Sequence, residues 1–389
     1  MTQNTQLHSF RFKGQGAEFF GIWIVNLLLS ILTLGIYSAW AKVRTHRYFY
    51  GNTELDGDHF EYLATPRQIL IGRIVTVLVL LLWGFANNAS PILAMVLGLL
   101  FAVLMPVLVV RNLRFDARVT RFRNVRFDFA GGYGPAYANL LGKPLAGYLA
   151  VGLAVTLAAL LGGVVGPGLA VVLAVLVGLL GMVCIYAWVS SSMAQYLMSG
   201  YRYGDKAFSA EVAFGEYFKI GALAALIGIG LMLAIVTVLS VVVGINVVAD
   251  MQQLGAHAKD PQMARAMMPL VFGFYLSFFV TALFVSAFVK AKVRNYLFSC
   301  TQIEGGLQLV SNMKPLSYLG LVLTNLLLVV FTLGFGSAWA RVRYARFLAD
   351  CTAVEGDLAL VAVQDHQHET DVAIADELAS AFDVQIGVL

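Results

Sequence analysis

Eight apolar segments run through the chain and limit what it can fold into. Six of them come in pairs: residues 69–86 with 92–110, 145–165 with 169–189, and 218–249 with 270–289. Two more, residues 18–37 and 316–338, stand alone near the ends. Only 12% of the 389 residues are charged, whereas a soluble domain carries about 25%. About 20 apolar residues are enough to cross a bilayer, so these segments predict membrane helices.

The order of the segments predicts the architecture. Short polar or Gly-rich turns join the members of two pairs, at residues 87–91 and 166–168. We therefore predict an all-α polytopic membrane protein with about six long transmembrane helices in three pairs, plus the two terminal apolar segments. In this interpretation residues 1–364 form one integral membrane domain, built from repeats, and residues 365–389 form an acidic C-terminal tail.

A motif at the end of the first lone segment returns at the end of the last one. Residues 33–44 read Thr-Leu-Gly-Ile-Tyr-Ser-Ala-Trp-Ala-Lys-Val-Arg, and residues 332–343 read Thr-Leu-Gly-Phe-Gly-Ser-Ala-Trp-Ala-Arg-Val-Arg. Three weaker copies follow the three pairs. Each copy leads into alternating residues, and Asp56-Gly57 after the first copy is a hairpin signal. We therefore predict short β-hairpin-like units that are repeated five times.

Aromatic and basic residues gather in these copies. Trp and Tyr prefer headgroup depth in a membrane, and Lys and Arg extend from helix ends toward anionic headgroups. The sequence thus predicts contact with the lipid bilayer, and with anionic headgroups in particular. The predicted interface residues are Trp40, Lys42, Arg44, Arg47, Tyr48, Arg111, Arg114, Trp188, Lys290, Lys292, Trp339, Arg341, Arg343 and Arg346. The arginines at 111–126 directly follow a membrane segment, so we expect no nucleic-acid partner.

The distribution of charge predicts the orientation. The turns at 87–91 and 162–168 contain no Lys or Arg, whereas most copies of the motif are basic. Cytoplasmic loops of inner-membrane proteins are enriched in Lys and Arg, so we expect the repeated units on the cytoplasmic side of a bacterial inner membrane. The lone segments leave two alternatives. Each crosses the membrane, or each re-enters it and breaks near residues 33–35 and 332–334.

Several stretches match a known bacterial family. They are the arm from Phe10 to Gly14, residues 33–37 with Trp40, the pair Arg47-Tyr48, and the second copy from Leu113 to Phe127. On these residues the chain resembles the YjgN-like family of bacterial multi-pass inner-membrane proteins, and the resemblance covers most of residues 8–310. It implies an inner-membrane location. It implies no activity and no catalytic residues, because the family is functionally uncharacterised.

No catalytic, metal-binding or cofactor-binding motif stands out in the sequence. His-Glu-x-x-His, Gly-x-Ser-x-Gly and Walker-type loops are absent. Cys184, Cys300 and Cys351 are scattered and show no metal-ligand spacing. We therefore expect no enzyme activity, no cofactor and no metal.

Two functional hypotheses remain. The first is a transporter or channel-like protein with a small-molecule substrate and a site between the two Thr-Leu-Gly breaks. Its candidate residues, which equally fit helix packing, are Asn26, Thr33, Gly35, Ser38, Asn325, Thr332, Gly334 and Ser337. The alternative is a non-enzymatic membrane scaffold that binds anionic lipids or partner proteins through its basic and aromatic units.

Overall fold

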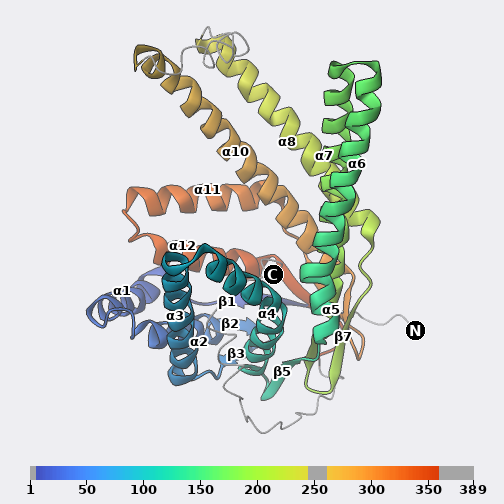
Figure 1. The fold of residues 1–389 in the computed structure, drawn as a ribbon. Coiled ribbons are helices and arrows are strands. Elements are labelled where there is room, and N and C mark those ends of the chain that lie inside the picture. Colours follow the sequence, from blue (N-terminus) through green and yellow to red (C-terminus); the bar gives the residue numbers. More distant parts are fainter. Residues whose placement is uncertain (1–5, 244–260, 359–389) are drawn as a thin grey trace.

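The computed structural model describes residues 6–243 and 261–358 (Figure 1). At its centre lies a closed barrel of ten antiparallel strands in the order β1-β10-β9-β8-β7-β6-β5-β4-β3-β2. The prediction of an all-α protein is therefore wrong, although most of the described residues are helical. The acidic tail at 365–389 lies outside the described residues.

Five units with the order strand, helix, helix, strand build the barrel. Unit one comprises β1 (Leu7–Phe12), α1 (Gly16–Leu32), α2 (Ser38–Gly51) and β2 (Thr53–Leu55). Unit two comprises β3 (Asp58–Tyr62), α3 (Pro66–Ala89), α4 (Pro91–Arg118) and β4 (Thr120–Phe122). Unit three comprises β5 (Val125–Phe129), the short helix α5 (Tyr133–Tyr137), the π-helix η1 (Ala138–Gly142), α6 (Lys143–Val165), α7 (Pro167–Gly200) and β6 (Tyr201–Tyr203).

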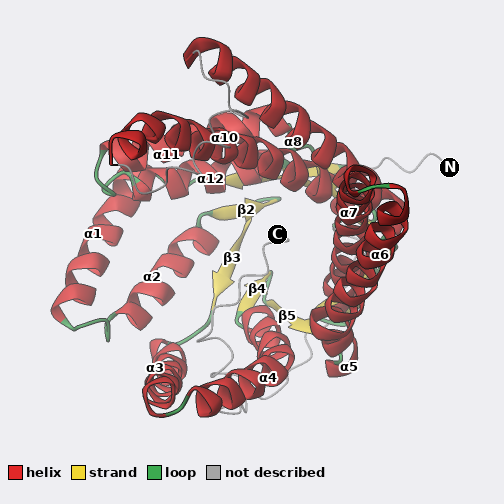
Figure 2. Ribbon diagram, turned by 45° about the horizontal axis from the view of Figure 1, so that its top comes forward, coloured by secondary structure: helices red, strands yellow, loops and turns green. Residues whose placement is uncertain are grey.

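The last two units follow the same order. Unit four comprises β7 (Lys206–Ala210), α8 (Phe214–Val243), α10 (Pro261–Ser299) and β8 (Thr301–Ile303). Unit five comprises β9 (Leu307–Ser311), α11 (Pro315–Phe331), α12 (Ser337–Asp350) and β10 (Thr352–Glu355). Figure 2 shows the helix pairs arranged around the strands.

Each strand from β2 to β9 pairs with one neighbour through a tight turn and with the other across a helix pair. β2 and β3 form a hairpin in which Leu55 lies opposite Asp58. Both turn residues, Asp56 and Gly57, have positive φ, which is the type I′ geometry that suits the twist of a hairpin. β1 pairs with β2 across α1 and α2, and it also pairs with β10, which closes the barrel.

Threonines mark the change from helix to strand in four of the units. The hydroxyl groups of Thr53, Thr120, Thr301 and Thr352 donate to the carbonyl four residues earlier, over 2.6–2.8 Å. These bonds satisfy carbonyls that the end of a helix leaves unpaired. Each threonine then begins the second strand of its unit.

Apolar side chains fill the interior of the barrel. Leu55, Phe122 and Val354 belong to a cluster whose buried members are at most 8% exposed. Phe60 extends this cluster by stacking on Phe122 and on Phe10, with ring centroids 4.6 Å and 6.0 Å apart. The interior that these described residues form is therefore a packed core, as in other small barrels.

The barrel is not visible in the sequence because its strands are short and pair over long distances. They contain three to six residues, so their alternation is too brief to separate strand from loop. The hairpin turns are local and have a sequence signal. The pairing of β5 with β6 spans a whole helix pair, and the pairing of β1 with β10 joins the two ends of the chain.

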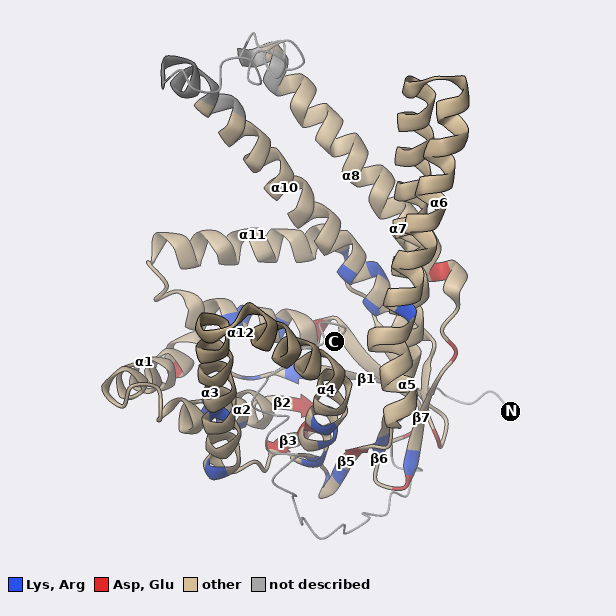
Figure 3. Ribbon diagram, viewed as in Figure 1, with Lys and Arg blue, Asp and Glu red and all other residues tan. Residues whose placement is uncertain are grey.

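Six helical segments are long and apolar enough to cross a membrane. They are Pro66–Ala89, Pro91–Arg118, Tyr133–Val165, Pro167–Gly200, Phe214–Val238 and Val271–Ser299. Lys and Arg residues gather near the barrel, whereas long stretches of α6, α7, α8 and α10 carry none (Figure 3). The barrel and the helix ends next to it thus form the charged part of the molecule.

The two lone apolar segments form helical hairpins. α1 and α11 have 17 residues each, and the helices that return from them, α2 and α12, have 14 each. The strands that flank α1 and α2 pair with each other in the barrel. The hairpin therefore begins and ends at the same place, and a single crossing of the membrane is incompatible with this pairing.

Candidate functional site

The two Thr-Leu-Gly breaks form the tips of the helical hairpins. Leu34 and Leu333 have positive φ and are 95% and 89% exposed. Gly35 and Gly334 follow with φ of 91° and 94°, a region that glycine adopts readily. A Cβ atom added to either glycine would meet nothing within 4 Å. The tips thus protrude from the molecule instead of facing a cavity wall.

The two asparagines of the candidate substrate site bond within their own hairpins. The amide nitrogen of Asn26 donates to the carbonyl of Ala41 over 3.5 Å. In unit five, Asn325 donates to the carbonyl of Ala340 over 3.2 Å. Each bond ties the first helix of a hairpin to the second.

The hydroxyl groups near the tips are also engaged locally. Thr33 and Thr332 donate to carbonyls four residues earlier, over 2.7 Å and 2.6 Å. The hydroxyl of Ser38 donates to the carbonyl of Gly35 and accepts a hydrogen bond from Arg73 of α3. At the second tip, the amide of Ser337 donates to the carbonyl of Gly334 over 3.1 Å.

The structure does not bring the two tips face to face. α12 of unit five packs on α1 of unit one, where Trp339 stacks on Phe20 at 4.7 Å and Phe335 meets the edge of Trp23 at 6.2 Å. The hairpin of unit one packs in turn on α3 of unit two, as the contact between Ser38 and Arg73 shows. The two hairpins therefore occupy successive positions around the barrel, each against the first helix of the next unit.

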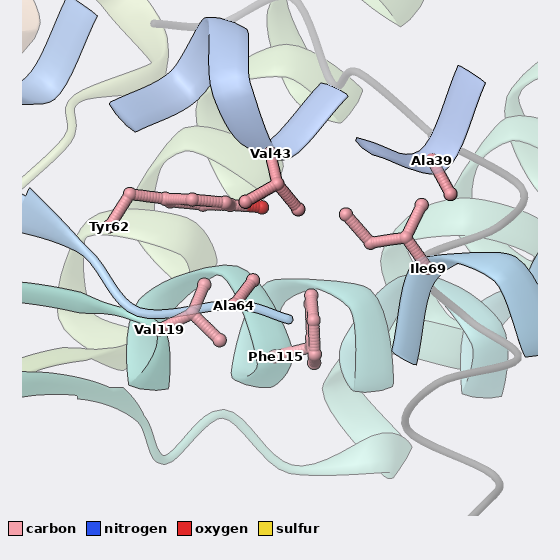
Figure 4. Packing of buried hydrophobic residues seen from close by; sticks show 7 residues of the cluster. All are labelled: Ala39, Val43, Tyr62, Ala64, Ile69, Phe115 and Val119. Carbon is pink, nitrogen blue, oxygen red and sulfur yellow. The ribbon is translucent and has the colours of Figure 1, made fainter. Parts of the chain in front are cut away.

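An apolar seam joins unit one to unit two. Ala39 and Val43 of α2 meet Ile69 of α3 and Phe115 of α4, and each of the four is at most 3% exposed. The residues that complete the cluster are Tyr62, Ala64 and Val119 (Figure 4). The repeated spacing of the motif thus has a packing role in this seam, since Ala39 and Val43 belong to it.

Three arginines of the predicted lipid interface donate hydrogen bonds to the next unit. Their acceptors are carbonyls just after the first strand of that unit. In unit four, Asn295 occupies the same position and donates to the carbonyl of Met313 over 2.9 Å. The arginine bonds run from Arg47 to Ala64 over 3.3 Å, from Arg114 to Gly131 over 2.9 Å, and from Arg346 to Gly14 over 3.0 Å.

Tyr48, another predicted interface residue, is buried within unit one. Its hydroxyl accepts a hydrogen bond from the amide of Gln15 over 2.8 Å and lies 3.0 Å from a carboxylate oxygen of Glu18. Burial raises the pKa of Tyr48 to about 12, because the charged phenolate is costly away from water. Tyr196 and Tyr296 make corresponding bonds in units three and four.

The remaining predicted interface residues are partly packed and partly exposed. Lys290 donates to the hydroxyl of Tyr344 over 3.1 Å, and Arg343 donates to Thr324 over 2.9 Å. Lys42 and Arg111 are half-buried. Lipid contact of the whole set stays a prediction. Exposed members are Trp40, Arg44, Arg47, Trp188, Lys292, Trp339, Arg341, Arg343 and Arg346.

A polar cavity in unit three involves residues that the sequence analysis missed. It has a volume of about 440 Å³ and lies between the residues after β5 and the helix α7. Lys143 and Arg202 line it, and no acidic residue of the described ranges does. Among the described residues neither cation has an ion-pair partner, and the ammonium group of Lys143 lies 6.0 Å from the ring centroid of Trp188.

The signal for this cavity is a departure from the repeat. Ser192 and Gln195 line the cavity, and they stand where unit one carries Arg44 and Arg47. The shorter side chains leave room beside α7. In unit three the cavity thus lies where the side chains depart from the repeat.

The described residues form no metal site of His, Cys, Asp and Glu ligands. Within residues 6–243 and 261–358, no group of three or more His, Cys, Asp and Glu side chains could hold a metal ion. The cysteines Cys184, Cys300 and Cys351 are all free and half-buried.

Comparisons with known proteins place the chain in a family. A family model described as "Bacterial protein of unknown function (DUF898)" matches residues 7–381. Inner membrane protein YjgN of Salmonella typhimurium is 25% identical over 366 residues, which cover 90% of this chain and 89% of the relative. Inner membrane protein YjgN of Escherichia coli K12 is 37% identical over 123 residues, or 31% of each chain. No solved structure matches the chain. With its apolar helix pairs and this match across nearly its whole length, the chain belongs to the DUF898 family of YjgN-like, multi-pass inner-membrane proteins.

Proposed function

We propose that this protein is a non-enzymatic scaffold of the inner membrane that binds anionic phospholipid headgroups at its cytoplasmic side. The observation that carries the proposal is the cavity of unit three. It presents Lys143 and Arg202, and no carboxylate of the described residues lines the cavity to neutralise them.

The chemistry of the cavity suits a phosphate group. Ammonium and guanidinium groups form charge-assisted hydrogen bonds with phosphate oxygens. Ser192 and Gln195 add neutral donors, and the exposed Gly132 adds backbone to the lining. A phosphodiester that entered the cavity would therefore meet two cations and several neutral donors.

The surroundings of the cavity suit the rest of a phospholipid. Trp188 is 40% exposed beside Lys143, and Trp prefers the headgroup region of a membrane. Just beyond Lys143, α6 exposes Leu145 and Leu149 to 63% and 67%. Acyl chains of a lipid held at Lys143 would run along this apolar face.

The helical hairpins support attachment to the same leaflet. Their tips expose apolar side chains, including Leu34, Leu333 and Phe335, while Arg44 and Arg341 lie exposed on the helices that return to the barrel. Apolar residues that insert at the boundary, with basic residues behind them, are typical of segments that lie in a membrane interface. The positive-inside rule favours the cytoplasmic leaflet.

The geometry favours this proposal over transport between the breaks. A substrate site there would need polar groups that face a shared cavity. Asn26, Asn325 and the neighbouring hydroxyl groups instead bond within their own hairpins. The two hairpins also pack in sequence around the barrel and do not oppose each other.

Lipid retention by the purified full-length protein tests the proposal. Native mass spectrometry compares retention of phosphatidylglycerol and phosphatidylcholine by the wild type and by the double variant Lys143→Gln/Arg202→Gln. We expect the wild type to prefer phosphatidylglycerol. We expect the double variant to bind it roughly 30-fold more weakly, because each basic residue near a membrane surface contributes about 1 kcal/mol.

A matched double variant controls for the loss of charge. Arg121 and Lys206 on the barrel strands pair with Glu61 and with Asp205 of the turn before β7, so Arg121→Gln/Lys206→Gln should retain the lipid preference. Equal retention of both lipids by the wild type would contradict lipid binding. Retention of a protein partner that depends on Lys143 and Arg202, without any lipid preference, would favour the partner-binding alternative.

A further inference from the structure

A second cavity lies where the interior of the barrel meets the helices. Its volume is about 330 Å³, which is within the range of small-molecule sites. Phe10 and Phe60 form its wall on the barrel side, and Tyr50 of α2 and Ala345 of α12 contribute from the helices. Arg294 of α10 supplies a cation to this largely apolar lining.

Arg294 is buried, and no residue that the structure describes supplies a counter-ion. Arg294 is 8% exposed. One guanidinium nitrogen donates to the hydroxyl of Thr352 over 2.8 Å, and the guanidinium carbon lies 4.3 Å from the ring centroid of Phe298. Its Nε atom is buried without a hydrogen-bond partner. Among the residues that the structure describes, no carboxylate forms an ion pair with it.

The repeat shows that the fold does not require an arginine at this position. Arg294 stands seven residues before Thr301. Seven residues before the corresponding strand starts, the other units carry His46, Leu113, Ala194 and Ala345. Four units thus complete the same strand and helix arrangement with a His, a Leu or an Ala. The packing of α10 alone does not explain a guanidinium here.

A buried charge without a partner is costly. Moving a cation out of water costs several kcal/mol after relaxation, and native proteins pair such charges or neutralise them. The hydroxyl of Thr352 and the ring of Phe298 offset part of this cost but supply no negative charge. An anion in the adjoining cavity would supply it, because the cavity is lined by the same guanidinium.

The lining also limits what the rest of the ligand can be. Four aromatic side chains line the cavity: Phe10, Phe49, Tyr50 and Phe60. Their rings accept an apolar body but not a second charge. We infer that this cavity binds a small amphiphilic anion, with a carboxylate or a phosphate monoester held by Arg294 and an apolar body against the aromatic wall.

Thermal unfolding of the purified full-length protein tests this inference. The probes are laurate, phenyl phosphate and inorganic phosphate, each added to protein in a non-ionic detergent. We expect laurate or phenyl phosphate to raise the unfolding midpoint by about 5 °C at saturation, because a ligand that binds only the folded state stabilises it. Stabilisation by laurate alone indicates a lipid-derived ligand, and stabilisation by phenyl phosphate alone indicates a soluble one.

Two variants test separately the charge of Arg294 and the volume of the cavity. Arg294→Gln should abolish the response by removing the counter-ion, and Ala345→Leu should abolish it by filling the cavity while Arg294 stays in place. Lys292→Gln removes a charge from an exposed position of the same helix and should respond as the wild type does. The Lys143→Gln/Arg202→Gln variant should also respond normally, so this inference can fail or succeed independently of the proposed function.

Several results would overturn the inference. A wild type that none of the three probes stabilises has no such site. Stabilisation by inorganic phosphate alone would contradict an apolar body. A full response in Arg294→Gln, or in Ala345→Leu, would place the bound anion somewhere else.

Discussion

The barrel and the helix pairs around it differ in how closely the five units agree. In the barrel, four units place a threonine at the same position and make the same hydrogen bond with it. Around the barrel, the paired helices vary from 14 residues in α2 and α12 to 39 in α10. The regular part thus lies at the centre, and the variation lies in the helices.

The difference follows from what each part must satisfy. A strand in a closed barrel needs a partner on both sides, so a change in one unit disturbs two neighbours. A helix satisfies its own backbone hydrogen bonds, and its length is free to vary. The barrel therefore sets the number and order of the units. The length of each helix pair decides whether the unit is long enough to cross a membrane or ends as a short hairpin.

A substitution in the barrel should have the largest effect on stability. Phe122 is 5% exposed and stacks on Phe60, so Phe122→Ala should lower the free energy of unfolding by about 3–5 kcal/mol. Phe85 of α3 is 74% exposed, and Phe85→Ala should cost about 1 kcal/mol or less. Urea titration in mixed micelles measures both. Equal losses of unfolding free energy would show that the barrel core is no more sensitive to substitution than the exposed helix surface.

A substitution in the contact between units five and one should have an intermediate effect. A Cβ atom on Gly16 would lie 2.2 Å from the ring of Trp339, so Gly16→Ala should destabilise by about 1–3 kcal/mol through overpacking. Gly21 lies in the same helix, and a Cβ atom there would meet nothing within 4 Å. Gly21→Ala should leave stability unchanged or raise it by up to about 1 kcal/mol. Thermal unfolding midpoints of the two variants, measured in one detergent, test this difference. A similar drop in both midpoints would argue against a tight contact between Gly16 and Trp339.

The smallest effect is expected at the barrel turns, where the charges are exposed. The hydrogen bond from Arg123 holds the pKa of Asp56 below its usual range, with a further contribution from His8. Because the folded-state pKa is lowered, the stabilisation is present above the unfolded value of about 3.9 and is lost as the pH falls through the folded value. Asp56→Asn should therefore lower the unfolding midpoint slightly at pH 6. Between pH 5 and pH 3 the midpoint of the variant should fall less than that of the wild type. Unfolding midpoints of the wild type and of Asp56→Asn, recorded from pH 6 to pH 3, test this prediction. A constant difference between the two midpoints across that range would contradict it.

Some elements were predictable because their signals are local. The apolar segments of α3, α4, α6 and α7 are long runs with clear ends, and such runs predict membrane helices. Asp56-Gly57 predicts a tight turn because both residues tolerate positive φ. The family resemblance also rests on contiguous stretches, and the family match bears it out.

Other roles depend on residues that are far apart in the chain. The sequence predicts Arg346 at a lipid interface from its place after a Trp, and only the structure shows that it also donates to the carbonyl of Gly14 in the first unit. Arg294 follows Lys290 and Lys292 in a basic stretch of the sequence, and its contact with Thr352 arises because units four and five pack on each other. Neither partner is near enough in sequence to leave a local pattern.

The sequence by itself determined that this is a repeat-built membrane protein, because apolar runs of this length need lipid and the motif recurs at both ends. The tertiary structure decided that the repeats close into a ten-strand barrel, and that the Thr-Leu-Gly motif is the tip of a returning hairpin. The physical reason is the distance in sequence between the residues involved. Hydrophobic length and turn chemistry are properties of consecutive residues, whereas strand pairing, and the burial of Arg294 that follows from it, arise only when distant segments meet.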